Sequence, residues 1–198
     1  MTHGPQGERR AVIYLHGRCG DPHAFHAWDQ AVAQRATVIS IQGDVPCEGS
    51  QRTTWSRSAS GLDRRISRAL TAVSAERGAP LDETSLTVVG YSLGASRAED
   101  LTRAFPGRYP RAILVAGPVA PEVGSFTGGG AVVVVAGALD RRAHLQEGAA
   151  ALIAAGVVAS YLILPGAAHG AYGPEGERVM GEAFSWVFER VPSLARSP

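Results

Sequence analysis

Six short apolar runs recur along the chain, each five or six residues long and rich in Val, Ile, Leu and Ala. None of them alternates cleanly between apolar and polar positions. Continuous apolar runs of this length are typical of strands covered on both faces, as in a parallel sheet between layers of helices. The predicted strands are residues 11–15, 37–41, 86–90, 112–116, 131–136 and 160–164.

Between most of these runs, apolar residues recur at helical spacing. In the segment 57–76, Leu62, Ile66 and Leu70 are four residues apart, and arginines occupy other positions of the helical wheel. The same reasoning predicts helices over 23–35, 93–105, 144–155 and 175–191. Two connections have the composition of loops, namely the Gly- and Pro-rich crossover 117–130 and the long stretch 42–60.

Strands that alternate with helices indicate repeated βαβ units. The sequence therefore predicts an α/β fold with an open, mostly parallel six-stranded sheet and helices on both faces. No internal repeat, low-complexity tract or interdomain linker is visible, and 198 residues is a typical length for one domain. We expect a single domain over residues 1–198, with a core from about residue 11 to about residue 191.

Composition excludes several classes of protein. Hydrophobic residues make up 45% of the chain and charged residues 19%, which excludes general disorder. A net charge of +1 gives no reason to expect a nucleic acid partner, and no apolar run reaches the ~18–20 residues needed for stable membrane insertion. All 19 basic residues are Arg, and Lys and Asn are absent. This bias indicates GC-rich coding and favours a bacterial origin, so the arginines are not read as selected anion contacts.

The first residues contain no apolar signal core. We therefore expect either a cytoplasmic protein or an exported one whose signal has been trimmed. Two cysteines are too few for a four-cysteine zinc site, and the histidines have no convincing metal-ligand spacing. No metal and no organic cofactor is expected.

Residues 90–94 form a G-x-S-x-G motif, Gly-Tyr-Ser-Leu-Gly. It follows a predicted strand directly and precedes a predicted helix directly, which is the context in which this motif presents a nucleophile. A sharp strand-to-helix turn exposes the Ser92 hydroxyl at a helix N-terminus, where backbone N–H groups favour negative charge. The alternative is a plain turn with an incidental serine.

A serine nucleophile needs a base and an orienting carboxylate. His169 follows the last predicted strand, and Asp140 follows the strand before it, so both lie at the carboxyl edge of the sheet with Ser92. The chain order Ser, Asp, His is the order of α/β-hydrolases. The alternatives are a loop histidine without a special role and a helix-capping aspartate.

Two backbone N–H groups are expected to bind the oxyanion. One belongs to Leu93, directly after the nucleophile, and the second to Arg18 in the loop after the first strand, with Cys19 as the alternate. His16 is expected to be structural and bonded within that loop. Trp55, in the long loop 42–60, is a candidate for lining a substrate pocket.

Together these residues resemble the α/β-hydrolase superfamily over nearly the whole chain. The small lidless branch of carboxylesterases, acyl-thioesterases and dienelactone hydrolases is the most similar, on the motifs HGRCGD (16–21), GALD (137–140) and GAAH (166–169). The resemblance implies a minimal fold without a cap domain. One departure is Ser92, because a dienelactone hydrolase has cysteine as its nucleophile.

The resemblance implies a serine hydrolase that cleaves carboxylic esters through an acyl-enzyme. The alternatives are an acyltransferase or thioesterase with the same triad, and a non-catalytic ligand-binding module of the same fold. The expected partner is a small-molecule ester, with the protein a monomer or homodimer. Because no cap is expected, we predict an open site that prefers short or medium acyl chains.

In the strand order usual for this family, the first two strands are neighbours, and Cys19 and Cys47 follow them at the same edge of the sheet. A disulfide between them is therefore within reach. Two free thiols are the alternative, since no export signal is visible.

Overall fold

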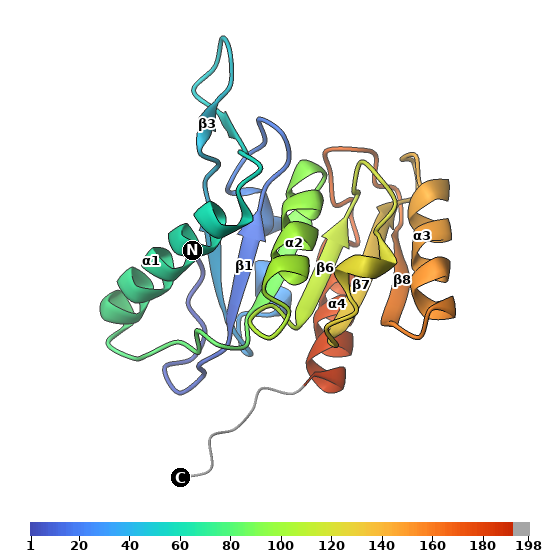
Figure 1. Cartoon of the computed structure of the whole chain (residues 1–198). Helices are drawn as coiled ribbons and strands as arrows, with labels where there is room; N and C mark the ends of the chain where they lie inside the picture. The colour runs from blue at the N-terminus through green and yellow to red at the C-terminus, as the bar shows by residue number, and fades with distance from the viewer. Residues whose placement is uncertain (192–198) are drawn as a thin grey trace.

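The computed structural model describes residues 1–191, so residues 192–198 of the predicted domain lie outside the described part. Six parallel strands form one sheet in the order β2-β1-β5-β6-β7-β8 (Figure 1). The strands are β1 (Ala11–Leu15), β2 (Thr37–Ile41), β5 (Thr87–Tyr91), β6 (Arg111–Val115), β7 (Ala131–Gly137) and β8 (Val158–Leu164). Each begins and ends within two residues of its predicted bounds.

The uninterrupted apolar runs are explained by burial on both sides of the sheet. Every residue of β1, β5, β6 and β7 is buried, whereas β8, at the edge, is mostly half-buried or exposed. A strand covered on both faces has no solvent side on which polar residues would alternate. The predicted α/β architecture is confirmed.

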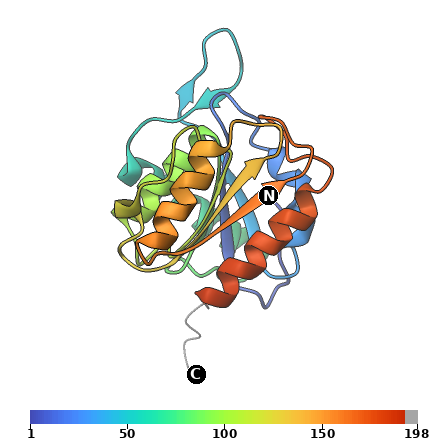
Figure 2. The same cartoon turned by 90° about the vertical axis from the view of Figure 1, so that its right-hand side faces the viewer.

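Helices cover both faces of the sheet (Figure 2). On one face lie α1 (Ala59–Arg77), α2 (Leu93–Ala104) and α3 (Ala143–Ala154), and on the other lies α4 (Gly176–Arg190). The apolar stripe Leu62, Ile66 and Leu70 of α1 is buried against the sheet, as its spacing requires. No helix within residues 1–191 has the length and apolarity that would let it span a membrane.

The predicted helix over 23–35 is wrong. Two short 3₁₀ helices occur there, η1 (Ala24–Ala27) and η2 (Asp29–Ala31), joined at Trp28, and they share the α4 face. Residues three apart also lie on one face of a 3₁₀ helix, so the spacing of Phe25 and Trp28 did not distinguish the two. Both aromatic side chains are fully buried, as either helix would have placed them.

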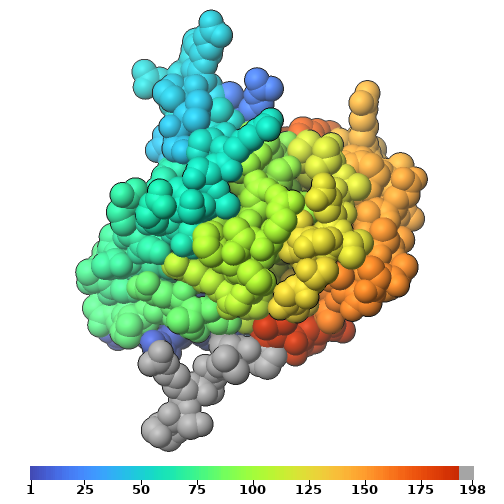
Figure 3. Space-filling model, viewed as in Figure 1, coloured from blue at the N-terminus to red at the C-terminus, as the bar shows by residue number. Residues whose placement is uncertain are grey.

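The long connection after β2 contains a hairpin that the sequence pattern did not reveal. Its strands are β3 (Val45–Pro46) and β4 (Thr53–Thr54), paired antiparallel. Figure 3 shows this hairpin standing away from the body of the molecule. Strands of two residues have no periodicity from which they can be recognised.

The crossover from β6 to β7 is a loop, as predicted, apart from the single-turn 3₁₀ helix η3 (Val123–Ser125). No α-helix lies between these two strands, so no helical cap is built from this connection.

Candidate active site

The site lies where the order of the strands reverses. β1 pairs with β2 on one side and with β5 on the other, and the chain leaves β1 and β5 at the same edge of the sheet. Open α/β sheets bind ligands at such a switch point, in the crevice outside the carboxyl ends of the strands. A cleft of about 380 Å³ opens there.

Ser92 occupies a strained turn between β5 and α2. Its φ of 51° and ψ of −119° lie outside the regions that ordinary L-residues prefer. A Cβ on Gly90 would collide with the carbonyl of Gly94, and a Cβ on Gly94 would collide with the carbonyl of Leu15. The two glycines of the motif are therefore required by close packing of β5, α2 and the end of β1.

The structure brings Ser92, His169 and Asp140 together. His169 Nε2 lies 3.1 Å from Ser92 Oγ, and His169 Nδ1 lies 2.7 Å from Asp140 Oδ2. The other carboxylate oxygen of Asp140 accepts the N–H of Arg141 at 2.7 Å. The His169 side chain is 52% exposed and that of Asp140 14% exposed, so the ring faces solvent while the carboxylate behind it is shielded.

The loops that carry Asp140 and His169 are bonded to each other. The Leu139 N–H donates to the Ala167 carbonyl at 2.9 Å, and the Ala138 N–H donates to the Leu164 carbonyl at 2.9 Å. These bonds continue the β7–β8 ladder past its last residue pair. The position of the acid relative to the base is thus set by the sheet itself.

The loop after β1 approaches Ser92 closely. A Cβ on Gly17 would lie 3.3 Å from the Cβ of Ser92. Within residues 1–191, neither the Arg18 nor the Cys19 N–H donates to another protein atom. Leu93 is the first residue of α2, so its N–H has no intrahelical acceptor. The amides predicted for the oxyanion are free to bind a ligand.

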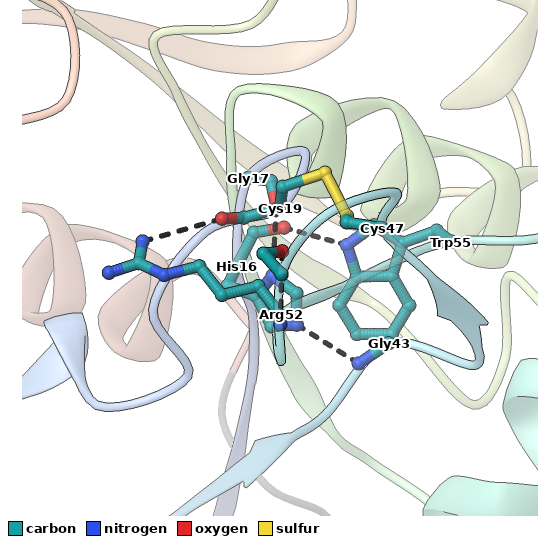
Figure 4. The surroundings of a disulfide bond; sticks show 8 residues. His16, Gly17, Cys19, Gly43, Cys47, Arg52 and Trp55 are labelled. Carbon is teal, nitrogen blue, oxygen red and sulfur yellow. Dashed lines mark hydrogen bonds between the residues drawn. A yellow bond between two sulfur atoms is a disulfide. The ribbon is translucent and has the colours of Figure 1, made fainter.

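A disulfide joins Cys19 to Cys47, with their Cα atoms 6.0 Å apart (Figure 4). The possibility that the sequence left open is thereby confirmed, because β1 and β2 are neighbours and both loops leave from the same edge. Cys19 has a φ of 50°, in the left-handed region that a non-glycine residue rarely adopts. The bond fixes this turn of the loop after β1 to the hairpin.

Three hydrogen bonds strengthen the same connection (Figure 4). The Trp55 indole N–H donates to the His16 carbonyl at 2.7 Å, and the Gly43 N–H donates to His16 Nε2 at 2.9 Å. The Arg52 guanidinium donates to the Cys19 carbonyl at 3.4 Å. Within residues 1–191, the disulfide and these hydrogen bonds tie the loop after β1 to the segment that follows β2.

His16 is bonded within its own loop, as predicted, and its ring also bonds to Gly43 in the segment that follows β2. Because Nε2 accepts the Gly43 N–H, Nδ1 carries the ring proton and donates to the Gly17 carbonyl at 2.7 Å. Burial lowers the pKa of His16 below its ordinary value, although the Gly17 carbonyl and the charge of Asp21 act in the opposite direction. The ring is therefore neutral in the folded protein at neutral pH.

The structure corrects the expectation for Trp55. Trp55 is 7% exposed, its ring lies 4.7 Å from that of His16, and it does not line the cleft. The hydrogen bond from its indole N–H to a backbone carbonyl is what allows so large a polar side chain to be buried. Trp55 supports the loop after β1 from behind.

The cleft has a lining that sequence reasoning mostly missed. Beside the loop 17–21, Ser92 and His169, its walls include Arg52 and three tyrosines, Tyr14, Tyr91 and Tyr172. Tyr91 is the variable second residue of the G-x-S-x-G motif, but the motif gives no role to its side chain. Within residues 1–191, no group of three or more His, Cys, Asp or Glu side chains is arranged to hold a metal ion.

Comparison with known proteins places the fold. No family model matches the sequence, and no curated protein matches it. The structure is similar to a carboxylesterase from Mesorhizobium loti (TM-score 0.65, 19% identity, 91% of this chain and 90% of that one). It is also similar to a carboxylesterase from Bacillus cereus (TM-score 0.65, 18% identity, 94% and 92%).

A third similar structure is an uncharacterized protein from Bacillus cereus (TM-score 0.71, 14% identity, 94% of this chain). The chain spans 62% of the length of that protein. At these identities the likeness concerns the fold, and the fold is that of the α/β-hydrolases.

Proposed function

We propose that the protein is a serine hydrolase that cleaves carboxylic esters of small molecules through an acyl-enzyme intermediate. The observation that carries this proposal is the unbroken chain of contacts from Ser92 Oγ through His169 to Asp140, set on a strained turn beside an open cleft. A serine at such a turn and a histidine within reach of its hydroxyl are the parts that acyl transfer requires.

In the proposed reaction, Ser92 Oγ attacks the ester carbonyl while His169 Nε2 accepts the hydroxyl proton. Asp140 holds the ring in the tautomer that leaves Nε2 free, and it stabilises the imidazolium that forms. The amides of Leu93 and Arg18 bind the oxyanion. His169 then donates the proton to the departing alcohol, and water releases the acyl group by the same steps.

The test is the Ser92→Ala variant, assayed with a fluorophosphonate probe and with 4-nitrophenyl esters. We expect the wild-type protein to be labelled at Ser92, and the variant to lose labelling and at least ~1,000-fold in kcat, because only oxyanion binding remains. Ser96→Ala, which removes a hydroxyl one turn along α2, is the matched control and should leave both unchanged. A Ser92→Ala variant that keeps about a tenth of the activity would rule out the proposal.

The cleft suits small acyl groups. Among residues 1–191, its lining contains no leucine, isoleucine, valine or phenylalanine, and its apolar wall is limited to the rings of three tyrosines and Ala24. A long acyl chain therefore finds few places to gain ~0.8 kcal/mol per buried methylene. We therefore propose short or medium acyl esters as substrates. A matched series of oxygen esters and thioesters of increasing chain length, with an added alcohol as competing acceptor, separates esterase, thioesterase and acyltransferase activity.

A further inference from the structure

We infer that Tyr91 is a positioning residue that fixes the distance between the serine and the histidine of the site, an inference that rests on the proposed function. The G-x-S-x-G turn requires glycines at its two ends and the serine at its centre, but it leaves the second position free. A tyrosine at that position therefore needs a separate explanation.

The Tyr91 hydroxyl reaches the loop that carries His169. It accepts the N–H of Gly170 at 2.6 Å. Gly170 directly follows His169, just as Ser92 directly follows Tyr91. The Tyr91 side chain thus connects the residue before Ser92 to the residue after His169 through one hydrogen bond.

The backbone next to His169 forms few other hydrogen bonds to side chains within residues 1–191. Within residues 1–191, the Tyr91 hydroxyl is the one side-chain group that accepts a hydrogen bond from the backbone of residues 165–170. The bonds from Ala138 and Leu139 hold the loop before His169, at Leu164 and Ala167. Tyr91 holds it immediately after the histidine.

Gly170, whose N–H makes this bond, lies in the left-handed backbone region that favours glycine. Its φ is +95°, and a Cβ there would meet nothing within 4 Å. Glycine is therefore favoured at this position by the backbone conformation, because a side chain would have room. The chain turns after His169 with the next N–H directed at the Tyr91 hydroxyl.

Tyr91 is itself held firmly. The residue is 7% exposed, and its ring lies 5.3 Å from the ring of Tyr172 and 5.8 Å from that of His169. Burial raises the pKa of Tyr91, and the nearby negative charge of Asp140 acts in the same direction. The hydroxyl therefore stays protonated at neutral pH.

The consequence for the reaction concerns geometry. The contact from His169 Nε2 to Ser92 Oγ is 3.1 Å, within hydrogen-bond reach but not short. A displacement of about 1 Å at such a contact is enough to cost on the order of 100-fold in rate. Loss of the Tyr91 bond leaves His169 joined to Asp140 but frees the backbone after it.

The test is Tyr91→Phe, which keeps the ring and removes only the hydroxyl that accepts the Gly170 N–H. We expect kcat and the rate of fluorophosphonate labelling at Ser92 to fall together by ~10-fold or more, with KM changed less than about twofold. Tyr161→Phe is the matched control, since the Tyr161 hydroxyl on β8 has no hydrogen-bond partner within the described residues. It should leave kcat, KM and labelling unchanged.

Two results would overturn the inference. One is a Tyr91→Phe protein whose kcat and labelling rate stay within about twofold of wild type, or whose loss appears in KM. The other is rapid hydrogen exchange of the Gly170 amide in the wild-type protein, a measurement that does not depend on the variant folding. Absence of any labelling at Ser92 in wild type would instead refute the proposed function, so the two failures are distinguishable.

Discussion

The loop after β1, residues 16–20, and the loop after β8, residues 165–170, both border the cleft at Ser92, but they are held in different ways. The first is tied to the hairpin segment by a disulfide and by bonds from Gly43, Arg52 and Trp55. The second is held by the Tyr91 hydroxyl at the end of β5 and by backbone bonds from the residues that follow β7.

The difference follows from the position of each loop relative to the sheet. The loop after β8 lies beside the ends of β7 and β5, so continuing the ladder and adding one buried hydroxyl suffices to hold it. The loop after β1 begins where both ladders of β1 end, at Leu15 paired with Ile41 and with Gly90. An outlying hairpin and a covalent bond take the place of the sheet there.

The largest expected effect comes from removing the contact between Asp140 and His169, on the side of the loop after β8. In Asp140→Asn, the amide group can still accept the Arg141 N–H but favours the wrong tautomer of His169. We expect kcat to fall by ~1,000-fold or more with little change in the melting temperature. Asp82→Asn, in the loop before β5, is the control and should behave as wild type. A fall in kcat of less than about tenfold would remove Asp140 from its proposed role.

This contrast also marks what the sequence could predict. Strands buried on both faces carry continuous apolar runs, and the residues that follow them give the positions of Ser92, Asp140 and His169 without any knowledge of side-chain contacts. The supports of the two loops could not be found in this way. The bond from Trp55 to His16 joins residues 39 apart, and that from Gly170 to Tyr91 joins residues 79 apart. Neither contact leaves a local pattern, and the expectation that Trp55 lines a substrate pocket was wrong for the same reason.

The cysteines are an intermediate case. Their positions after two strands indicated that a bond was within reach, but the sequence alone did not distinguish a disulfide from two free thiols. The strand order decided it, because β1 and β2 are adjacent. The disulfide between Cys19 and Cys47 can therefore be predicted once the strand order is known, but not from the sequence alone.

The next expected effect comes from opening the disulfide. Cys19 and Cys47 are 28 residues apart, and closing a loop of that length contributes about 3–4 kcal/mol in the chain-entropy model. We expect Cys19→Ser/Cys47→Ser to lose a comparable free energy of unfolding, measured by urea denaturation. At temperatures where it remains folded, kcat should fall by ~10-fold at most, because the bonds from Trp55 and Gly43 persist.

The comparison of the two loops is sharpened by combining variants. Reduction of the wild-type protein with a dithiol should reproduce the double variant, and neither should alter the exchange rate of the Gly170 amide. If opening the disulfide also releases the Gly170 amide, the two loops are not independently held. Equal stability of the double variant and the wild type would contradict the role of the disulfide as the main tie.

The smallest effect concerns acid and is specific to the loop after β1. Burial keeps the pKa of His16 below its ordinary value, and the charges of Arg52 and Arg65 lower it further, against the opposing effects of Gly17 and Asp21. In the unfolded chain the ring titrates near pH ~6.5. Below that pH the unfolded state binds a proton that the folded state does not, so stability is present above pH ~6.5 and is lost as the pH falls.

The slope of this loss is at most ~1.4 kcal/mol per pH unit, between the unfolded pKa and the lower folded one. Protonation of Nε2 also removes the acceptor of the Gly43 N–H, so the loop after β1 loosens while the Tyr91–Gly170 bond is unaffected. His16→Gln supplies a neutral acceptor that does not titrate. We expect urea denaturation from about pH 7 to about pH 5 to show a shallower fall in stability for this variant than for the wild type. Parallel slopes for the two proteins would mean that His16 does not carry the acid sensitivity, and the loop after β1 would then be no more acid-labile than the loop after β8.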